Sequence, residues 1–324
     1  MKKRTILVVA ILCIVSMTLF ASGQDEKTKP ARKQDLIFGT AGTSGTYYVV
    51  GAAMSASINK NSSTINVIVQ PTKGSIENLN LANTNDIQLG LSNSDGVYWA
   101  ATGTGTYKKS GPLNIKAVMT LYQSQGQMIA MENSGIKTYG DLKGKKVNLG
   151  PSGQTVVEIS KTVLRAYGID PEKDITPYYL AVDEGLGKLK DGEIDATFFT
   201  AAAPTAGVVN AAATSSIRLV DIDMTILKKV TDENPFYGIG IIPANTYKGQ
   251  TEDVNVIKMV TEVFASSEAS EEAIYEFVKQ AIETQPQYVN AHVSIKEITA
   301  ENASKAVTEL HPGALRYFKE IGLR

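Results

Sequence analysis

Cysteine is almost absent from this 324-residue sequence: the single one, Cys13, lies inside an apolar run near the N-terminus. If that run is removed during export, no thiol remains, which excludes disulfides, thiol nucleophiles and thiolate metal sites. The only histidines are His292 and His311, and the sequence contains neither metal-ligand spacing nor a G-x-S-x-G elbow. No block of basic residues occurs either. We therefore expect no nucleic-acid partner, no metal, no cofactor and no catalytic residues.

The first 23 residues have the pattern of an export signal. Lys2 to Arg4 are basic, Ile6 to Phe20 are apolar, and Ala21 to Gly23 offer small residues for cleavage. The apolar run is short for a membrane span, so an uncleaved anchor is the less favoured alternative, and lipid attachment at Cys13 stays open. The charged, proline-containing residues 24–35 predict a flexible leader. The sequence thus predicts an exported, periplasmic protein.

The chain that follows the export signal has the length and patterning of a two-domain α/β protein. After removal of residues 1–23 it keeps 29 basic and 33 acidic residues, and about 300 residues suit two domains rather than one. Short apolar runs such as Ile65 to Val69 predict strands, and they alternate with helical patterns such as Thr155 to Tyr167. Ser75 and Ser270 are good N-caps for helices, the latter amphipathic; Thr138 and Asp141 have capping-box spacing, and Gly168 closes the helical pattern that ends at Tyr167. This alternation predicts an α/β fold.

The most informative loop follows the first predicted strand. Its glycines at 39, 42 and 45 are spaced three apart, which matches neither the dinucleotide-binding pattern nor a P-loop. The loop leads into an apolar helical run, and the start of a helix offers free backbone N–H groups to an anion. We predict that this loop contacts a ligand through Thr43, Ser44, Gly45, Thr46 and Tyr47.

Two further loops repeat this geometry. Thr72 to Ser75 follows a strand and opens a helix that carries Asn78 one turn in, and Gly150 to Thr155 does the same in a second unit. If the loops of the two units face each other, their N–H groups could clamp a dicarboxylate or an amino acid without any arginine. Taken singly, each loop is as readily a structural helix cap as a ligand contact.

Other acidic and aromatic residues give weaker signals. Asp95, Asp183 and Asp195 could form an acid–base pair, but their spacing does not require one. Trp99, with Tyr98 beside it, is interpreted as packing beneath the cleft of the first domain. Neither group argues for an enzyme.

Five stretches of the sequence carry a resemblance to a known family: Phe38–Tyr48, Gln70–Leu79, Asp141–Val147, Leu189–Ala196 and His311–Glu320. In these motifs the chain resembles the TAXI family of extracytoplasmic solute receptors, the binding-protein components of TRAP transporters, and the resemblance covers essentially the whole mature chain. It implies a type II periplasmic-binding-protein fold, with two α/β lobes joined by a hinge. It also implies boundaries: lobe 1 over 36–124, lobe 2 over 125–240, and a return to lobe 1 over 241–324.

The resemblance also implies a function. Receptors of this family capture a small acidic solute between the lobes, of the glutamate, glutamine or 2-oxoglutarate class, and deliver it to integral membrane subunits. We expect this chain to do so as a monomer. Carried over motif by motif, the implied ligand contacts are Thr43, Ser44, Gly45, Thr46, Tyr47, Ser75, Asn78, Asn93, Ser94, Ser152, Gly153, Gln154, Thr155, Thr200 and Pro204.

The sequence departs from the family pattern at three places. The second-lobe loop, commonly G-P-x-G-S-G-T, loses a glycine here and gains the longer amide side chain of Gln154. Lys73 replaces a common glycine in the first lobe, and Thr200 and Pro204 stand in a shifted register. These changes leave the fold prediction intact and concern the identity of the solute. An enzyme on the same two-lobed scaffold, or a sensory or surface-exposed binding protein, is the alternative.

Overall fold

The structure is a computed structural model that describes residues 33–43 and 45–324. The predicted export signal, most of the predicted leader and Ser44 of the first glycine loop lie outside these residues. Within the described ranges, none of the helices combines the length and the apolar character that a membrane span requires.

In the described part of the chain, ten strands form one mixed sheet with the order β2-β1-β3-β10-β4-β7-β5-β6, to which β8 adds beside β4 and β9 beside β10. β1 is parallel to β2 and β3, and β5 is parallel to β6 and β7, as expected for strands that alternate with helices. The strands are β1 (Gln34–Gly39), β2 (Ile65–Gln70), β3 (Leu89–Asn93), β4 (Ile115–Met131), β5 (Lys146–Asn148), β6 (Thr176–Tyr178), β7 (Ala196–Ala201), β8 (Ile217–Leu219), β9 (Gly238–Ile242) and β10 (Val254–Ser266).

Helices cover both faces of this sheet. The α-helices are α2 (Thr46–Asn61), α3 (Ser75–Asn83), α4 (Ser94–Thr102), α5 (Thr155–Ala166), α6 (Val182–Lys190), α7 (Ala206–Thr214), α8 (Met224–Glu233), α9 (Glu271–Glu283), α10 (Gln285–Tyr288), α11 (Ala300–Ala303) and α12 (Pro312–Glu320). Short 3-10 turns lie at Gly105–Tyr107, Glu132–Ser134, Tyr139–Leu142, Val289–Ala291 and Val293–Glu297.

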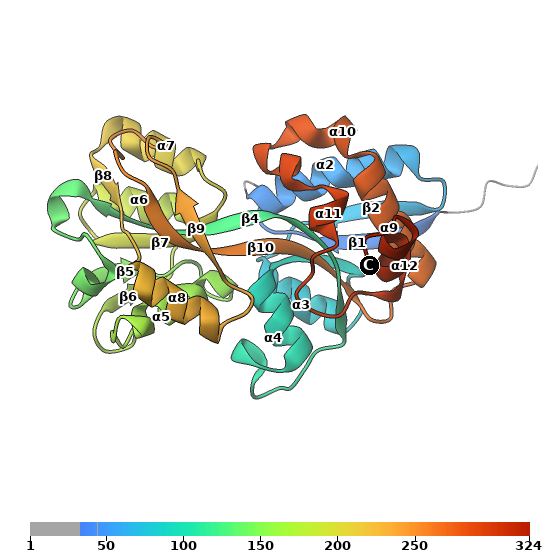
Figure 1. Ribbon diagram of the computed structural model, residues 1–324, viewed down its shortest axis with the longest axis horizontal. Coiled ribbons are helices and arrows are strands. Elements are labelled where there is room, and N and C mark those ends of the chain that lie inside the picture. The colour runs from blue at the N-terminus through green and yellow to red at the C-terminus, as the bar shows by residue number, and fades with distance from the viewer. Residues whose placement is uncertain (1–32, 44) are drawn as a thin grey trace, which may run out of the picture. The chain divides into compact units, whose positions relative to one another are not determined.

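Two long antiparallel strands connect the two halves of the sheet. β10 pairs with β3 on one side and with β4 on the other, and β4 continues beyond this pairing to β7 and β8. Figure 1 shows both strands running through the middle of the fold. We call β1–β3 with α2–α4 and α9–α12 the first half, and β5–β9 with α5–α8 the second half. β4 is buried along most of its length, which fits a strand that is covered on both faces.

Several predicted local signals are confirmed. Ser270 caps α9, since its hydroxyl accepts from Ala273 N at 3.4 Å. Thr138 and Asp141 form the predicted capping box, although the element that it opens is a 3-10 turn. One prediction was displaced: Ser75 is the first residue of α3, and Gly74 occupies the N-cap. Gly74 has φ 105°, a conformation that side chains disfavour, so glycine is required there.

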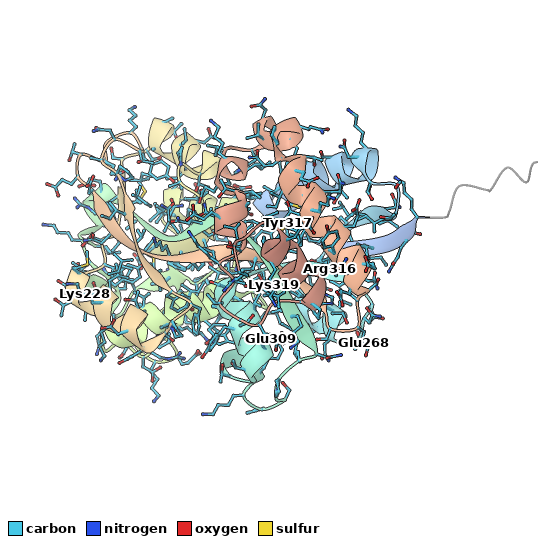
Figure 2. The ribbon with its side chains drawn as sticks, turned by 45° about the vertical axis from the view of Figure 1, so that its right-hand side comes forward. Lys228, Glu268, Glu309, Arg316, Tyr317 and Lys319 are labelled. Atoms are coloured by element: carbon cyan, nitrogen blue, oxygen red, sulfur yellow. The ribbon has the colours of Figure 1, made fainter. Side chains whose placement is uncertain are left out.

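The C-terminal helix closes the first half against α9. Gly313 lies so close to α9 that a Cβ there would stand 2.2 Å from the carbonyl oxygen of Glu271. Arg316 forms two 2.7 Å hydrogen bonds with the carboxylate of Glu272, and its guanidinium lies 4.2 Å from the centre of the Tyr275 ring. Figure 2 places Arg316 on α12, and Lys228 on α8 in the other half.

Candidate functional site

The loops that precede α3 and α5 meet, although they belong to different halves. The Gln154 side chain donates from Nε2 to the carbonyl oxygen of Lys73 at 3.0 Å. A second contact joins Asn93, at the end of β3, to Thr155, the first residue of α5, with 3.4 Å between Nδ2 and Oγ1. The loops that precede α3 and α5 therefore face each other, which is the condition for a ligand clamp between the two halves.

Tyr47 connects three of these loops within the first half. It stands in the first turn of α2, and its hydroxyl donates to Asn93 Oδ1 at 3.0 Å. The same hydroxyl lies 3.5 Å from Ser75 Oγ at the start of α3. Burial, with a smaller contribution from the charge of Asp95, raises the pKa of Tyr47 well above its usual value. The hydroxyl therefore stays protonated and serves as a hydrogen-bond donor in this cluster.

The helices that begin at the site lack side-chain caps. Within residues 33–43 and 45–324, no side-chain cap bond is formed at Gly45 before α2, Gly74 before α3, Asn93 before α4 or Gln154 before α5. Of the other long helices, α6 and α7 also lack such a bond, whereas α8, α9 and α12 begin with capping side chains, those of Asp223, Ser270 and His311. Backbone N–H groups at the uncapped starts remain suited to bind an anion.

Asn78 holds the loops of the first half together. Its side chain is completely buried; Nδ2 donates to the carbonyl oxygens of Thr40 at 2.7 Å and Leu91 at 2.8 Å, and Oδ1 accepts from Thr72 Oγ1 at 2.7 Å. Both amide hydrogens are thus used within the protein. Asn78 positions the ends of β1 and β3, and a direct contact with solute stays a prediction.

Other predicted residues lie at different depths of this region. Ser94 is buried and donates to the carbonyl oxygen of Phe236 in the second half at 3.0 Å. Ser152 and Gly153 are exposed and line a groove of about 350 Å³ on the outer side of the loop contact. Lys73 and Glu77 line the same groove, and the Lys73 backbone N–H donates to the Glu77 carboxylate. Thr43 is exposed as well.

Thr200 and Pro204 belong to a separate hydrogen-bonded loop. Thr200 lies on β7, and the Ala203–Pro204 peptide bond is cis. Two residues that the sequence reasoning missed organise this loop: Tyr247 donates to Gln127 Oε1 at 2.7 Å and accepts from the Thr205 backbone N–H at 2.8 Å. The part of Thr200 and Pro204 in solute binding stays a prediction.

Two buried carboxyl groups lie close to the loops. Asp95, at the start of α4, has no exposed surface; its Oδ1 accepts from Gly96 N at 2.8 Å and its Oδ2 from Tyr237 OH at 3.3 Å. Burial raises the pKa of Asp95 from 3.8 to about 7. Glu262 on β10 is equally buried, and burial raises its pKa from 4.5 to about 8, with a smaller contribution from the charge of Asp95.

Comparison with solved structures identifies the class of fold. A protein from Bordetella bronchiseptica RB50 matches with a TM-score of 0.55 and 14% identity over 89% of each chain. The alkanesulfonate-binding protein SsuA from Xanthomonas axonopodis pv. citri matches with a TM-score of 0.52 and 14% identity, over 89% of this chain and 84% of that chain. The binding-protein component of a phosphonate ABC transporter from Pseudomonas aeruginosa matches with a TM-score of 0.52 and 8% identity, over 80% of this chain and 79% of that chain. The chain has the periplasmic-binding-protein fold.

The family follows from the sequence itself. The NMT1-like family model matches residues 38–322, which is nearly the whole described chain. The chain therefore belongs to the NMT1-like family.

Proposed function

We propose that this protein is an extracytoplasmic solute receptor that captures a small acidic solute between its two halves and delivers it to membrane subunits. The observation that carries the proposal is the pair of hydrogen bonds between loops of different halves, Gln154 to Lys73 and Asn93 to Thr155. A solute held between these loops would contact both halves at once. Such a ligand favours the closed arrangement over an open one, because its contacts are lost when the halves part.

The chemistry of the loops favours an anionic group in the solute. The starts of α2, α3 and α5 lack side-chain caps and lie near one another through the contacts of Tyr47 and Gln154. Their N–H groups are fixed by the fold, so they bind a carboxylate with little loss of conformational entropy. We propose glutamate, glutamine and 2-oxoglutarate as the first solutes to test, as the family resemblance implies.

For the membrane partner we propose the subunits of a TRAP transporter. Its support is the resemblance to TAXI receptors in the motifs at Phe38–Tyr48 and His311–Glu320. An ABC transporter is the second candidate, because a structure with the same fold is a component of such a system for phosphonate. Purification of the native protein with its membrane partners, followed by mass spectrometry of those partners, decides between the two.

The role that we propose is non-enzymatic and periplasmic. Native mass spectrometry of the protein purified from its own cell identifies any acid that is bound to it. Isothermal titration calorimetry with that acid then tests Gln154→Ala and Tyr47→Ala, with Gln287→Ala as the control. Gln287 is an exposed glutamine whose side chain also forms hydrogen bonds, two with Asn61, but within the first half only.

The two site variants are expected to remain folded and to bind more weakly than the control. Gln154→Ala removes one hydrogen bond between the halves, which corresponds to about a fivefold loss at about 1 kcal/mol. Equal affinity in all three variants contradicts this site. Turnover of the acid in a sensitive assay would instead support the enzyme alternative.

A further inference from the structure

The first turn of α4 contacts the second half on two sides. Ser94 donates to the carbonyl oxygen of Phe236 at 3.0 Å, and the Tyr237 hydroxyl reaches Asp95. Phe236 and Tyr237 lie between α8 and β9, in the second half. On the other side, a Cβ on Gly96 would stand 2.9 Å from Cγ2 of Thr155 at the start of α5. The halves thus meet tightly around α4.

Aromatic rings complete this contact. The Phe236 ring lies 4.9 Å from the ring of Tyr98 and 5.6 Å from that of Trp99, both on α4. Tyr237 packs edge-on against Phe236 at 4.6 Å. Trp99 is the only tryptophan of the chain. Its fluorescence therefore reports whether the Phe236 segment remains in place.

Asp95 brings an ionisable side chain into this contact, and the second half covers it. Its carboxylate interacts with the hydroxyl groups of Tyr237 and Thr155, which both come from that half. If the halves separate, these two groups leave and water reaches the carboxylate. A carboxylate is far better solvated by water than by two hydroxyl groups in a closed interface, so closing must either desolvate the charge or neutralise it.

The charged neighbours of Asp95 do not neutralise it. The titratable side chains that interact with it are the protonated Tyr47 from α2, Tyr237, and Glu262 from β10, and Glu158 of α5 acts in turn on Tyr237. Within residues 33–43 and 45–324, no lysine or arginine is among the groups that shift the pKa of Asp95. The nearby carboxyl group of Glu262 offers no positive charge either, and the charge of Asp95 adds to the rise of its pKa.

We propose that closing of the two halves takes up a proton at Asp95, so that the receptor closes more readily at acid than at neutral pH. The inference rests on the proposed opening and closing of the halves. The sign follows from the two states. In the open state Asp95 is solvated and has an ordinary pKa of 3.8, whereas in the closed state burial raises its pKa to about 7. The closed state therefore holds the proton more tightly, and closing weakens as the pH rises from 3.8 to about 7.

The test uses the full mature protein, freed of bound solute by unfolding and refolding in urea. Trp99 emission and the radius of gyration from small-angle X-ray scattering are measured at about pH 5.5 and about pH 8. With pKa values of 3.8 and about 7, the ratio of closed to open protein falls about thirtyfold between these conditions. The expected result is a larger radius and a red-shifted Trp99 emission at the higher pH.

Three variants make the test specific. Asp95→Asn removes the titrating group and is expected to remain closed at both pH values, while the exposed Asp232→Asn behaves like the wild type. Tyr237→Phe removes a hydroxyl group that lowers the pKa of Asp95, so the midpoint of opening moves to higher pH. This third variant keeps the test valid if Asp95→Asn fails to fold.

Two results would overturn the inference. One is a solute-free wild-type protein whose radius and emission are the same at both pH values. The other is a pH dependence that persists in Asp95→Asn or a midpoint that does not move in Tyr237→Phe. Failure of the proposed function is distinguishable, because calorimetry would then detect no solute binding at either pH.

Discussion

Replacement of Asn78 by aspartate tests how the loops of the first half are held. The two side chains have the same size and shape, so Asn78→Asp leaves no cavity. The substitution removes the –NH2 group that donates to the carbonyl oxygens of Thr40 and Leu91 at 2.7 Å and 2.8 Å. It also brings a carboxylate oxygen against these carbonyl oxygens in a site without exposed surface.

The expected cost follows from the two carbonyl groups that lose their partner. A buried polar group without a hydrogen bond costs about 1–3 kcal/mol, so the two together predict a loss of roughly 2–6 kcal/mol. Protonation of the introduced carboxylate would restore one donor, which makes the lower end of this range the expected value in mildly acid solution. Since whole domains are stable by only about 5–15 kcal/mol, a loss of this size is readily measured.

Urea unfolding followed by far-UV circular dichroism measures the change. Asn210→Asp is the matched control, because Asn210 is exposed on α7 and the same substitution there is expected to change the free energy of unfolding by less than about 0.5 kcal/mol. If Asn78→Asp is as stable as this control at neutral pH, the side chain does not hold the loops and the reasoning from its hydrogen bonds is wrong.

Three further predictions concern other parts of the fold. Burial raises the pKa of Glu262 from 4.5 to about 8, so the wild type is expected to lose up to about 1.4 kcal/mol of stability per pH unit as the pH rises through this window. Glu262→Gln should make this loss smaller. Urea unfolding at several pH values measures the difference. Gly185→Ala should lower the free energy of unfolding by about 1–3 kcal/mol, because a Cβ at this position would lie 2.5 Å from Thr197 Oγ1 and 2.6 Å from Asn148 Nδ2. Thermal unfolding measures the change, and an unchanged melting temperature contradicts this packing. Phe236→Ala should shift the Trp99 emission to the red and weaken solute binding, and an unchanged spectrum would show that the ring does not cover Trp99.

The parts of the fold that the sequence predicted well depend on nearby residues. The cap at Ser270, the capping box of Thr138 and Asp141, and the end of α5 before Gly168 are each made within a few positions of the chain. Bonds between residues this close in the chain require particular residue types at a fixed spacing, which can be recognised in the sequence. The displaced cap at Ser75 is an instructive exception, since the backbone conformation of Gly74, and not a side-chain bond, begins α3 there.

The residues that the sequence reasoning missed have distant partners. Tyr237 lies 142 positions from Asp95, and Tyr247 lies 120 positions from Gln127. No pattern among neighbouring residues of the sequence indicates such a distant pair. Asn78 was predicted as a ligand contact from its place one turn into α3, but the spacing could not show that both of its amide hydrogens would be used by Thr40 and Leu91.

The sequence by itself determined the α/β class, the family motifs and the places where glycine-containing loops lead into helices, because these depend on periodicity and on bonds between near neighbours. Only the tertiary structure decided which loops face each other, that Gln154 reaches Lys73, and that Asp95 is buried beneath Tyr237. Burial and the pKa that follows from it depend on which distant segments pack together. That packing is a property of the whole sheet, with β4 and β10 joining its halves, and not of any segment alone.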